Sequence, residues 1–127
     1  MKKIIVKEIY PVYQMEIKKT DFTKSIWDIV DHFLQKVEED PIAELIWIFE
    51  HYTHTKKLNW PMVEGVVDAK MIVFCFGSKI ASIPSLALKP RSFSIIETED
   101  KFIIEFMEAP SDEAVKKMTN WTKELLK

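Results

Sequence analysis

The chain has 127 residues, of which 47% are hydrophobic, so it can bury a sizeable core and is not a disordered polypeptide. Its net charge of −2 arises from lysines that alternate with carboxylates, which argues against the strongly basic face that nucleic-acid binding requires. No linker or repeat divides the sequence, and we expect a single domain over residues 1–127 with no nucleic-acid partner.

Localisation is predicted from the cysteine content and from the lengths of the apolar runs. Cys75 is the single cysteine, so no intrachain disulfide can form, as is typical of a reducing compartment. The apolar run Ile4–Val6 is shorter than the roughly seven residues of a signal peptide, and no run approaches the roughly 20 residues of a membrane span. An excess of lysine over arginine is typical of an AT-rich bacterial genome. We expect a cytoplasmic bacterial protein with no membrane contact.

The N-terminal third predicts extended structure followed by a helix. Residues 3–18 alternate apolar and polar side chains, and Pro11 predicts an edge, a bulge or a turn within them. Residues 22–39 carry an apolar stripe at helical spacing, and Thr20 or Asp21 is expected to cap this helix. The stripe consists of Ile26, Val30, Phe33, Leu34 and Val37.

The middle of the chain predicts two strands separated by a loop. Residues 42–53 are rich in β-branched and aromatic side chains and predict a strand, with a short buried helix as the alternative. Residues 54–68 contain a proline and a glycine and predict a loop, with or without a turn of helix. Residues 69–76 predict a strand, and residues 78–91 predict irregular or briefly helical structure.

The C-terminal third predicts a hairpin followed by a helix. The two arms of the hairpin are Ser92–Glu97 and Lys101–Met107. In the second arm, Phe102, Ile104 and Phe106 point to one face of the sheet and the residues between them to the other. The helix begins after Pro110, with Ser111 as its N-cap and acidic residues in its first turn. Its apolar stripe consists of Ala114, Met118, Trp121 and Leu125.

These elements predict an α+β fold, in which an antiparallel sheet of about five strands has two helices packed on one face, in the order β-α-β4-α. The other face of the sheet would be exposed to water or covered by a second subunit. The strands carry more aromatic side chains than two helices can cover, so we expect a homodimer that forms through this face. These aromatics are Trp47, Phe49, Phe74 and Phe76.

The order of elements resembles the TATA-binding-protein-like fold, and within it the chain resembles the domain-of-unknown-function family 302. Three features carry the resemblance: Ile48-Phe49-Glu50-His51, which is similar to that family's Ile-Asp-His, the strand Met71–Gly77, and the hairpin Ser92–Met107 followed by Glu108-Ala109-Pro110. A separate small uncharacterised bacterial family with the same pattern is the alternative. The resemblance implies a fold and no established catalytic residue.

Glu50, His51 and His54 form a cluster of potential metal ligands. On a helix the two histidines are neighbours that could both ligate a metal, whereas on a strand they point to opposite faces. The alternative is a pair of half-exposed histidines at the end of a strand. A third ligand would come from elsewhere in the chain, and the candidates are His32, Asp68 and Cys75.

Arg91 is the only arginine, and its planar fork suits a carboxylate or phosphate ligand. The alternative is an ordinary surface ion pair with Glu97 or Glu108. Three aromatic side chains could line a pocket for an apolar ligand, with packing in the core or an interface as the alternative. These side chains are Trp47, Tyr52 and Trp60.

Glycine-rich phosphate cradles, paired-cysteine motifs and nucleophile elbows are absent from the sequence. We therefore expect a non-enzymatic homodimer that binds a small apolar or acidic ligand, or a protein partner. The alternative is a metal-binding or metal-dependent protein that uses Glu50, His51 and His54. The sequence identifies no cofactor.

Overall fold

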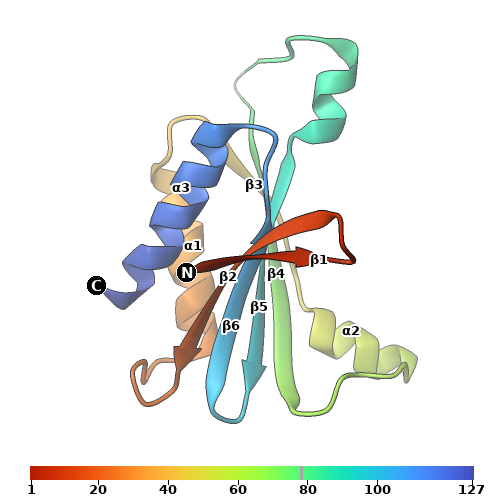
Figure 1. Ribbon diagram of the computed structural model, residues 1–127, viewed down its shortest axis with the longest axis vertical. Coiled ribbons are helices and arrows are strands. Elements are labelled where there is room, and N and C mark those ends of the chain that lie inside the picture. The colour runs from red at the N-terminus through yellow and green to blue at the C-terminus, as the bar shows by residue number, and fades with distance from the viewer. Residues whose placement is uncertain (78) are drawn as a thin grey trace.

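A computed structural model describes residues 1–77 and 79–127 and contains a six-stranded antiparallel sheet with helices α1 and α3 on one face (Figure 1). The strand order is β1-β2-β6-β5-β4-β3. The strands are β1 (Lys2–Val6), β2 (Tyr10–Lys18), β3 (Ala43–Phe49), β4 (Val66–Phe76), β5 (Pro90–Thr98) and β6 (Lys101–Met107). The helices are α1 (Ile26–Glu39), α2 (His51–Leu58) and α3 (Asp112–Lys123), with 3-10 turns η1 (Ile83–Leu88) and η2 (Glu124–Leu126).

The predicted α+β class and the helix-covered antiparallel sheet are confirmed, with six strands in place of about five. The extra strand arises because residues 3–18 fold back on themselves as a hairpin. Lys7 and Glu8 form its turn with positive φ angles of 51° and 67°, which are uncommon without glycine. Ser78, at the start of the segment expected to be irregular, lies outside the described residues.

Both covering helices begin at a serine that accepts a hydrogen bond from the first turn. Ser111 caps α3 as predicted, by accepting from the Ala114 amide at 3.4 Å. For α1 the expected caps, Thr20 and Asp21, are wrong, because the helix starts later, at Ile26. Ser25 caps it instead in a reciprocal box with Asp28, which stabilises the start of a helix by about 1 kcal/mol.

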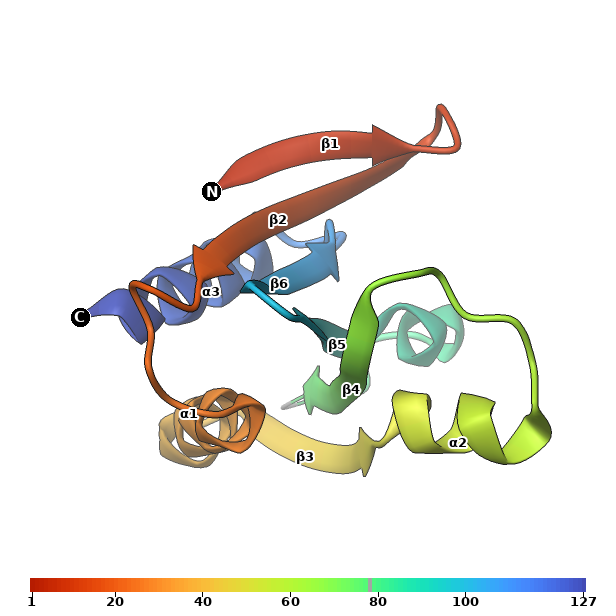
Figure 2. The same cartoon turned by 90° about the horizontal axis from the view of Figure 1, so that it is seen from below.

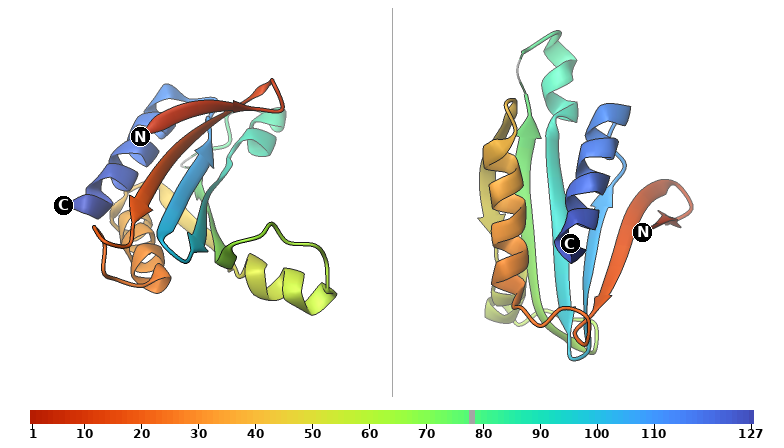
Figure 3. Two further views of the ribbon diagram at one scale, coloured as in Figure 1. Left: turned by 60° about the horizontal axis from the view of Figure 1, so that its bottom comes forward. Right: turned by 90° about the vertical axis from the view of Figure 1, so that its left-hand side faces the viewer.

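The core lies between these two helices and the sheet, and its centre is aromatic. Phe33 of α1 stacks on Phe93 of β5 at 4.1 Å, and Phe93 stacks on Phe74 of β4 at 5.5 Å between ring centroids. Trp121 of α3 completes this aromatic group, and the centroid of its ring lies 5.4 Å from that of Phe76. Figure 3 shows both helices against the same face of the sheet, so their apolar stripes and the inward strand residues bury one another.

The apolar surplus expected on the uncovered face is smaller than predicted. Phe74 is fully buried and Phe76 contacts Trp121, so both of these residues belong to the helix-covered face. Trp47 does lie on the open side, where 70% of its surface is exposed, because a bulge shifts the register between Leu45 and Trp47.

The strand expected over residues 42–53 ends at Phe49, and its last three residues, His51, Tyr52 and Thr53, belong to α2. Glu50 turns the chain, and α2 closes at Asn59, whose left-handed conformation lets its amide donate to carbonyls of the last turn. Helix α2 lies apart from α1 and α3, beyond the end of β3 (Figure 2). Among the described residues, we find no helix with the length and apolarity needed to cross a membrane.

Candidate functional site

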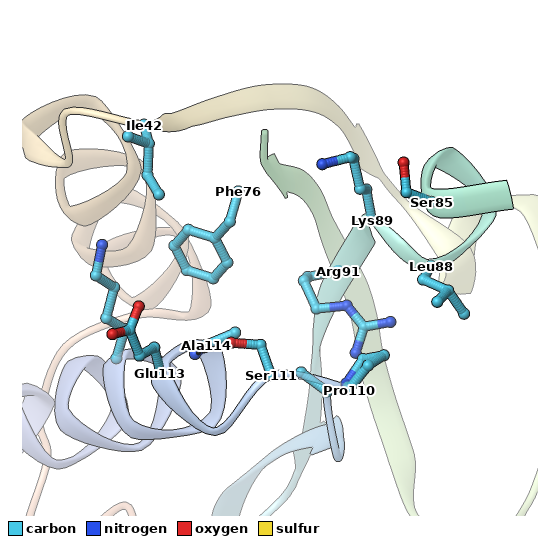
Figure 4. Close-up of a pocket in the computed structure, with 12 residues that line it drawn as sticks. Ile42, Phe76, Ser85, Leu88, Lys89, Arg91, Pro110, Ser111, Glu113 and Ala114 are labelled. Carbon is cyan, nitrogen blue, oxygen red and sulfur yellow. Dashed lines mark hydrogen bonds between the residues drawn. The ribbon is translucent and has the colours of Figure 1, made fainter. Parts of the chain in front are cut away.

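A cavity of about 310 Å³ lies at the end of the sheet where β5 begins, between η1 and the first turn of α3 (Figure 4). Strand β6 runs into α3 through a short connection, which brings the start of that helix to the start of β5. Most of the lining is apolar. The apolar lining residues are Ile42, Phe76, Leu88, Ala109, Pro110 and Ala114.

Arg91 supplies a positive charge to this cavity. It lies opposite Phe74 in the β4–β5 pairing, so its side chain shares the helix-covered face of the sheet. Its guanidinium donates to the carbonyls of Pro90 at 2.9 Å and Glu108 at 3.5 Å, and burial lowers its pKa. Figure 4 shows the guanidinium beside Pro110, at the start of α3.

Arg91 does not form the surface ion pair that was its alternative role. Glu97 pairs with Lys19 at 2.6 Å, and Glu108 pairs with Lys3 at 2.7 Å while accepting a hydrogen bond from Tyr13. Within residues 1–77 and 79–127, no carboxylate lies at ion-pair distance from the guanidinium. Among the residues that the structure describes, the half-buried arginine therefore faces the cavity without a carboxylate partner.

Two lysines and two carboxylates complete the electrostatics of the cavity. Lys89 donates to the carbonyl of Lys79 at 2.8 Å and, in the part of the chain that the structure describes, pairs with no carboxylate. Lys117 pairs at 2.8 Å with Asp40, whose carboxylate is only 7% exposed. Burial works to raise the pKa of Asp40, but hydrogen bonds from Lys117 and a backbone amide outweigh it and lower the pKa. The exposed carboxylate of Glu113 lies at the rim.

The predicted metal ligands occupy the opposite end of the molecule. His51 and His54 are neighbours on α2, the arrangement in which both could ligate one metal ion. The ring of His51, however, contacts the Thr55 hydroxyl at 3.0 Å. Glu50 accepts a hydrogen bond from Lys70 at 2.8 Å. Over the part of the chain that the structure describes, no three His, Cys, Asp or Glu side chains converge.

The candidate third ligands are placed elsewhere or already paired. His32 lies on α1, where its ring contacts the Trp121 carbonyl at 2.7 Å, and burial is the main cause of its lowered pKa. Cys75 lies on β4, opposite Glu44 of β3. Asp68 pairs with Lys70 at 3.3 Å. The structure therefore does not bring these residues to the histidines.

The three candidate aromatic residues do not share a pocket. Tyr52 lines a second cavity of about 290 Å³, formed by α2, the following loop and the open faces of β4 and β5. Trp47 and Trp60 are outside it, with 70% and 69% of their surfaces exposed. Arg91 and Tyr52 therefore line different cavities, and Arg91 is the charged residue of the two.

The sequence pattern does not identify Lys89, Lys117, Phe76 and Glu113 as residues that share a cavity with Arg91. One available signal is the short connection after the hairpin. A helix that starts five residues after β6 ends must begin at the end of the sheet where β5 starts. That signal places the first turns of α3 near Arg91, although it does not give side-chain contacts.

Comparison with known proteins supports the fold and leaves the activity open. A search of curated proteins finds no match. A crystal structure of an uncharacterised conserved DUF302 protein from Bacillus stearothermophilus is similar, with a TM-score of 0.56 and 10% identity over 91% of this chain and 86% of that one. At this identity the likeness shows a shared fold alone. The model of a family of unknown function, DUF6858, matches residues 1–127, and the chain belongs to that family.

Proposed function

We propose that this protein binds a small molecule that carries an acidic group on an apolar body, in the cavity lined by Arg91. The observation that carries the proposal is a half-buried guanidinium that faces a largely apolar cavity and has no carboxylate partner among the described residues. Most buried charges in proteins are paired, because an unpaired charge loses its hydration without compensation. A bound anion would supply the missing partner, with charge-assisted hydrogen bonds to the planar fork.

The surroundings of Arg91 support binding rather than catalysis. The polar groups at the cavity are cations, serines and one rim carboxylate, and no nucleophile–base pair is found among them. The apolar lining would contact the body of the ligand, and the charged fork would fix its orientation. The first turn of α3 adds the positive end of a helix dipole at the same place.

A thermal-shift screen of small amphipathic anions, with neutral analogues of the same size, tests this proposal. We expect anions to raise the melting temperature and neutral analogues to have little effect. In Arg91→Gln the affinity for the anions should fall roughly tenfold or more, because a charge-assisted pair is lost. Lys116→Gln, which removes an exposed positive charge of α3 outside the cavity, should bind as the wild type does. Equal affinity in Arg91→Gln would contradict the proposal.

We also propose that the protein pairs with a second copy of itself through the β3 side of the sheet. Over β2 and β6 the open face carries polar pairs beside its apolar residues, since Gln14 bonds Glu105 at 2.9 Å and Lys101 pairs with Glu16. The edge strand β3 instead exposes large apolar side chains, an arrangement that supports protein contact. These side chains are Ile46 and Trp47, with Leu45 exposed on the helix-covered side of the same strand.

The two edges of the sheet differ in a way that favours self-association at β3. The outer strand β1 also exposes Ile5, but it begins with Lys2 and Lys3, and lysines on an edge strand discourage pairing. Light scattering at micromolar concentration should give a dimer mass, which Trp47→Lys should reduce to that of a monomer. A monomeric wild-type protein would contradict this proposal and leave the proposed ligand site unaffected.

A further inference from the structure

We infer that the ligand of the Arg91 cavity is a monocarboxylate with an apolar chain, and that Glu113 disfavours dianions such as phosphate monoesters at this site. The inference rests on the proposed function, since it specifies the acidic group of the same ligand. It is carried by the charges that surround the cavity and by the volume and lining of the space that they enclose.

The charges around the cavity nearly cancel and leave room for one negative charge. Lys89, Arg91 and Lys117 contribute three positive charges, and Asp40 and Glu113 contribute two negative ones, which leaves about one positive charge. A monoanion neutralises that remainder. A second negative charge on the ligand would have only Lys89, which already donates to the Lys79 carbonyl, as a further unpaired cation among the described residues, and it would still lose its hydration on entering the cavity.

The positions of these charges assign the carboxylate to Arg91 rather than to either lysine. Lys117 is held by Asp40 at 2.8 Å and lies over the Phe76 ring, 5.3 Å from its centroid. Lys89 is held by the Lys79 carbonyl. Arg91 uses its Nε for Pro90 and makes a single long contact with Nη1, so guanidinium donors are left for a ligand.

The rim carboxylate of Glu113 provides the discrimination between anions. It is an exposed residue in the first turn of α3 and lines the same cavity as Arg91. A phosphate monoester carries between about 1.5 and 2 negative charges at neutral pH, whereas a carboxylate carries one. The extra charge would be repelled by Glu113, which carries the same sign and lines the same cavity.

The volume of the cavity sets the length of the apolar chain. At the roughly 30 Å³ that a water molecule occupies, about 310 Å³ accommodates on the order of ten non-hydrogen atoms. Octanoate has that size, and its chain could contact Phe76, Leu88 and Ala114. Octyl phosphate and octanol are matched probes, because each also has eight carbon atoms and differs from octanoate mainly in its head group.

Calorimetric titration of the wild-type protein with these three probes at neutral pH tests the inference. We expect octanoate to bind roughly threefold to tenfold more tightly than octyl phosphate, and octanol to bind more weakly than octanoate. Glu113→Gln should raise the affinity for octyl phosphate about threefold or more and change octanoate binding less. This variant alters an exposed side chain, so the fold is expected to persist, and circular dichroism checks that it does.

The outcomes separate this inference from the proposed function on which it rests. Octyl phosphate that binds as tightly as octanoate, or that gains nothing from Glu113→Gln, would overturn the carboxylate assignment. If such binding still required Arg91, the anion site itself would stand. An octanol affinity equal to that of octanoate, or no binding of any amphipathic anion, would overturn both the carboxylate assignment and the anion site.

Discussion

Lys70 and Arg91 are cations on the same face of neighbouring strands, at opposite ends of the sheet, and they have different surroundings. Lys70 on β4 is 3% exposed, pairs with Glu50 at 2.8 Å and Asp68 at 3.3 Å, and lies 4.3 Å from the centroid of the Trp27 ring. Arg91 on β5 has no carboxylate partner among the described residues and faces a cavity.

The difference indicates which cation stabilises the fold and which one is available to a ligand. Lys70 joins the start of α2, the start of β4 and α1 through its two carboxylates and one ring, so its interactions are satisfied within the chain. Arg91 donates to two carbonyls, but among the described residues no carboxylate neutralises its charge. Charges that are partly buried without a counter-charge are expected mainly at functional sites.

The largest effect on stability is expected from Lys70→Met, which removes the paired cation. It removes the cation between two carboxylates, and we expect the free energy of unfolding to fall by about 2–3 kcal/mol in urea denaturation. The value lies below that of a fully buried pair because Glu50 is half exposed. Lys57→Met, an exposed control on α2, should change stability by about 0.5 kcal/mol or less. A wild-type stability for Lys70→Met would show that the cluster is not structural.

An intermediate effect is expected from alkaline pH, which removes the charge of Lys70 without a mutation. Burial works to lower the pKa of Lys70, but hydrogen bonds and charges of Glu50 and Asp68 outweigh it, so its pKa is raised in the folded state. The resulting stability is complete below the unfolded lysine pKa of about 10.4 and is lost as pH rises through the folded value.

The measurement is urea denaturation of the wild type and Lys70→Met at a series of pH values from neutral to alkaline. The difference in stability between them should shrink above about pH 10.4, because the wild type loses the contribution that the variant lacks. A difference that stays constant across this range would contradict the assigned role of the ion pairs.

The smallest effect on stability is expected from Arg91→Met, which tests whether the unpaired cation contributes to the fold. Replacing a half-buried unpaired cation by an apolar side chain of similar length should leave stability unchanged or raise it by up to about 1 kcal/mol. Urea denaturation of the ligand-free protein measures this. A loss above about 2 kcal/mol would mean that Arg91 has a structural role after all.

The sequence patterns predict the elements whose cause is local. Period-3.6 stripes and a serine cap predict α3, and alternation predicts the β5–β6 hairpin, whose residues Phe102, Ile104 and Phe106 are buried together. The end of β3 was harder to predict, because Glu50 joins a strand directly to α2 with no glycine or proline between them.

The candidate site depends on interactions between residues that are far apart in the sequence. Glu97 and Glu108 were plausible partners for Arg91 by proximity, but the sheet brings Lys3 of β1 and Lys19, which follows β2, to them. Which lysine reaches which carboxylate depends on strand order and register, and a residue pattern does not contain that information. The sequence is enough to single out Arg91 as the one arginine. That no carboxylate among the described residues pairs with it could be seen only in the structure.

The most direct test of the central claim uses the fact that Arg91 is the only arginine in the chain. Its Nε–H group therefore gives a single arginine side-chain resonance in a nitrogen–proton NMR spectrum. We predict that octanoate shifts this resonance saturably, with the same midpoint as its calorimetric binding, and that octanol does not. A resonance that stays unmoved while octanoate binds would contradict the claim that Arg91 holds the acidic group of the ligand.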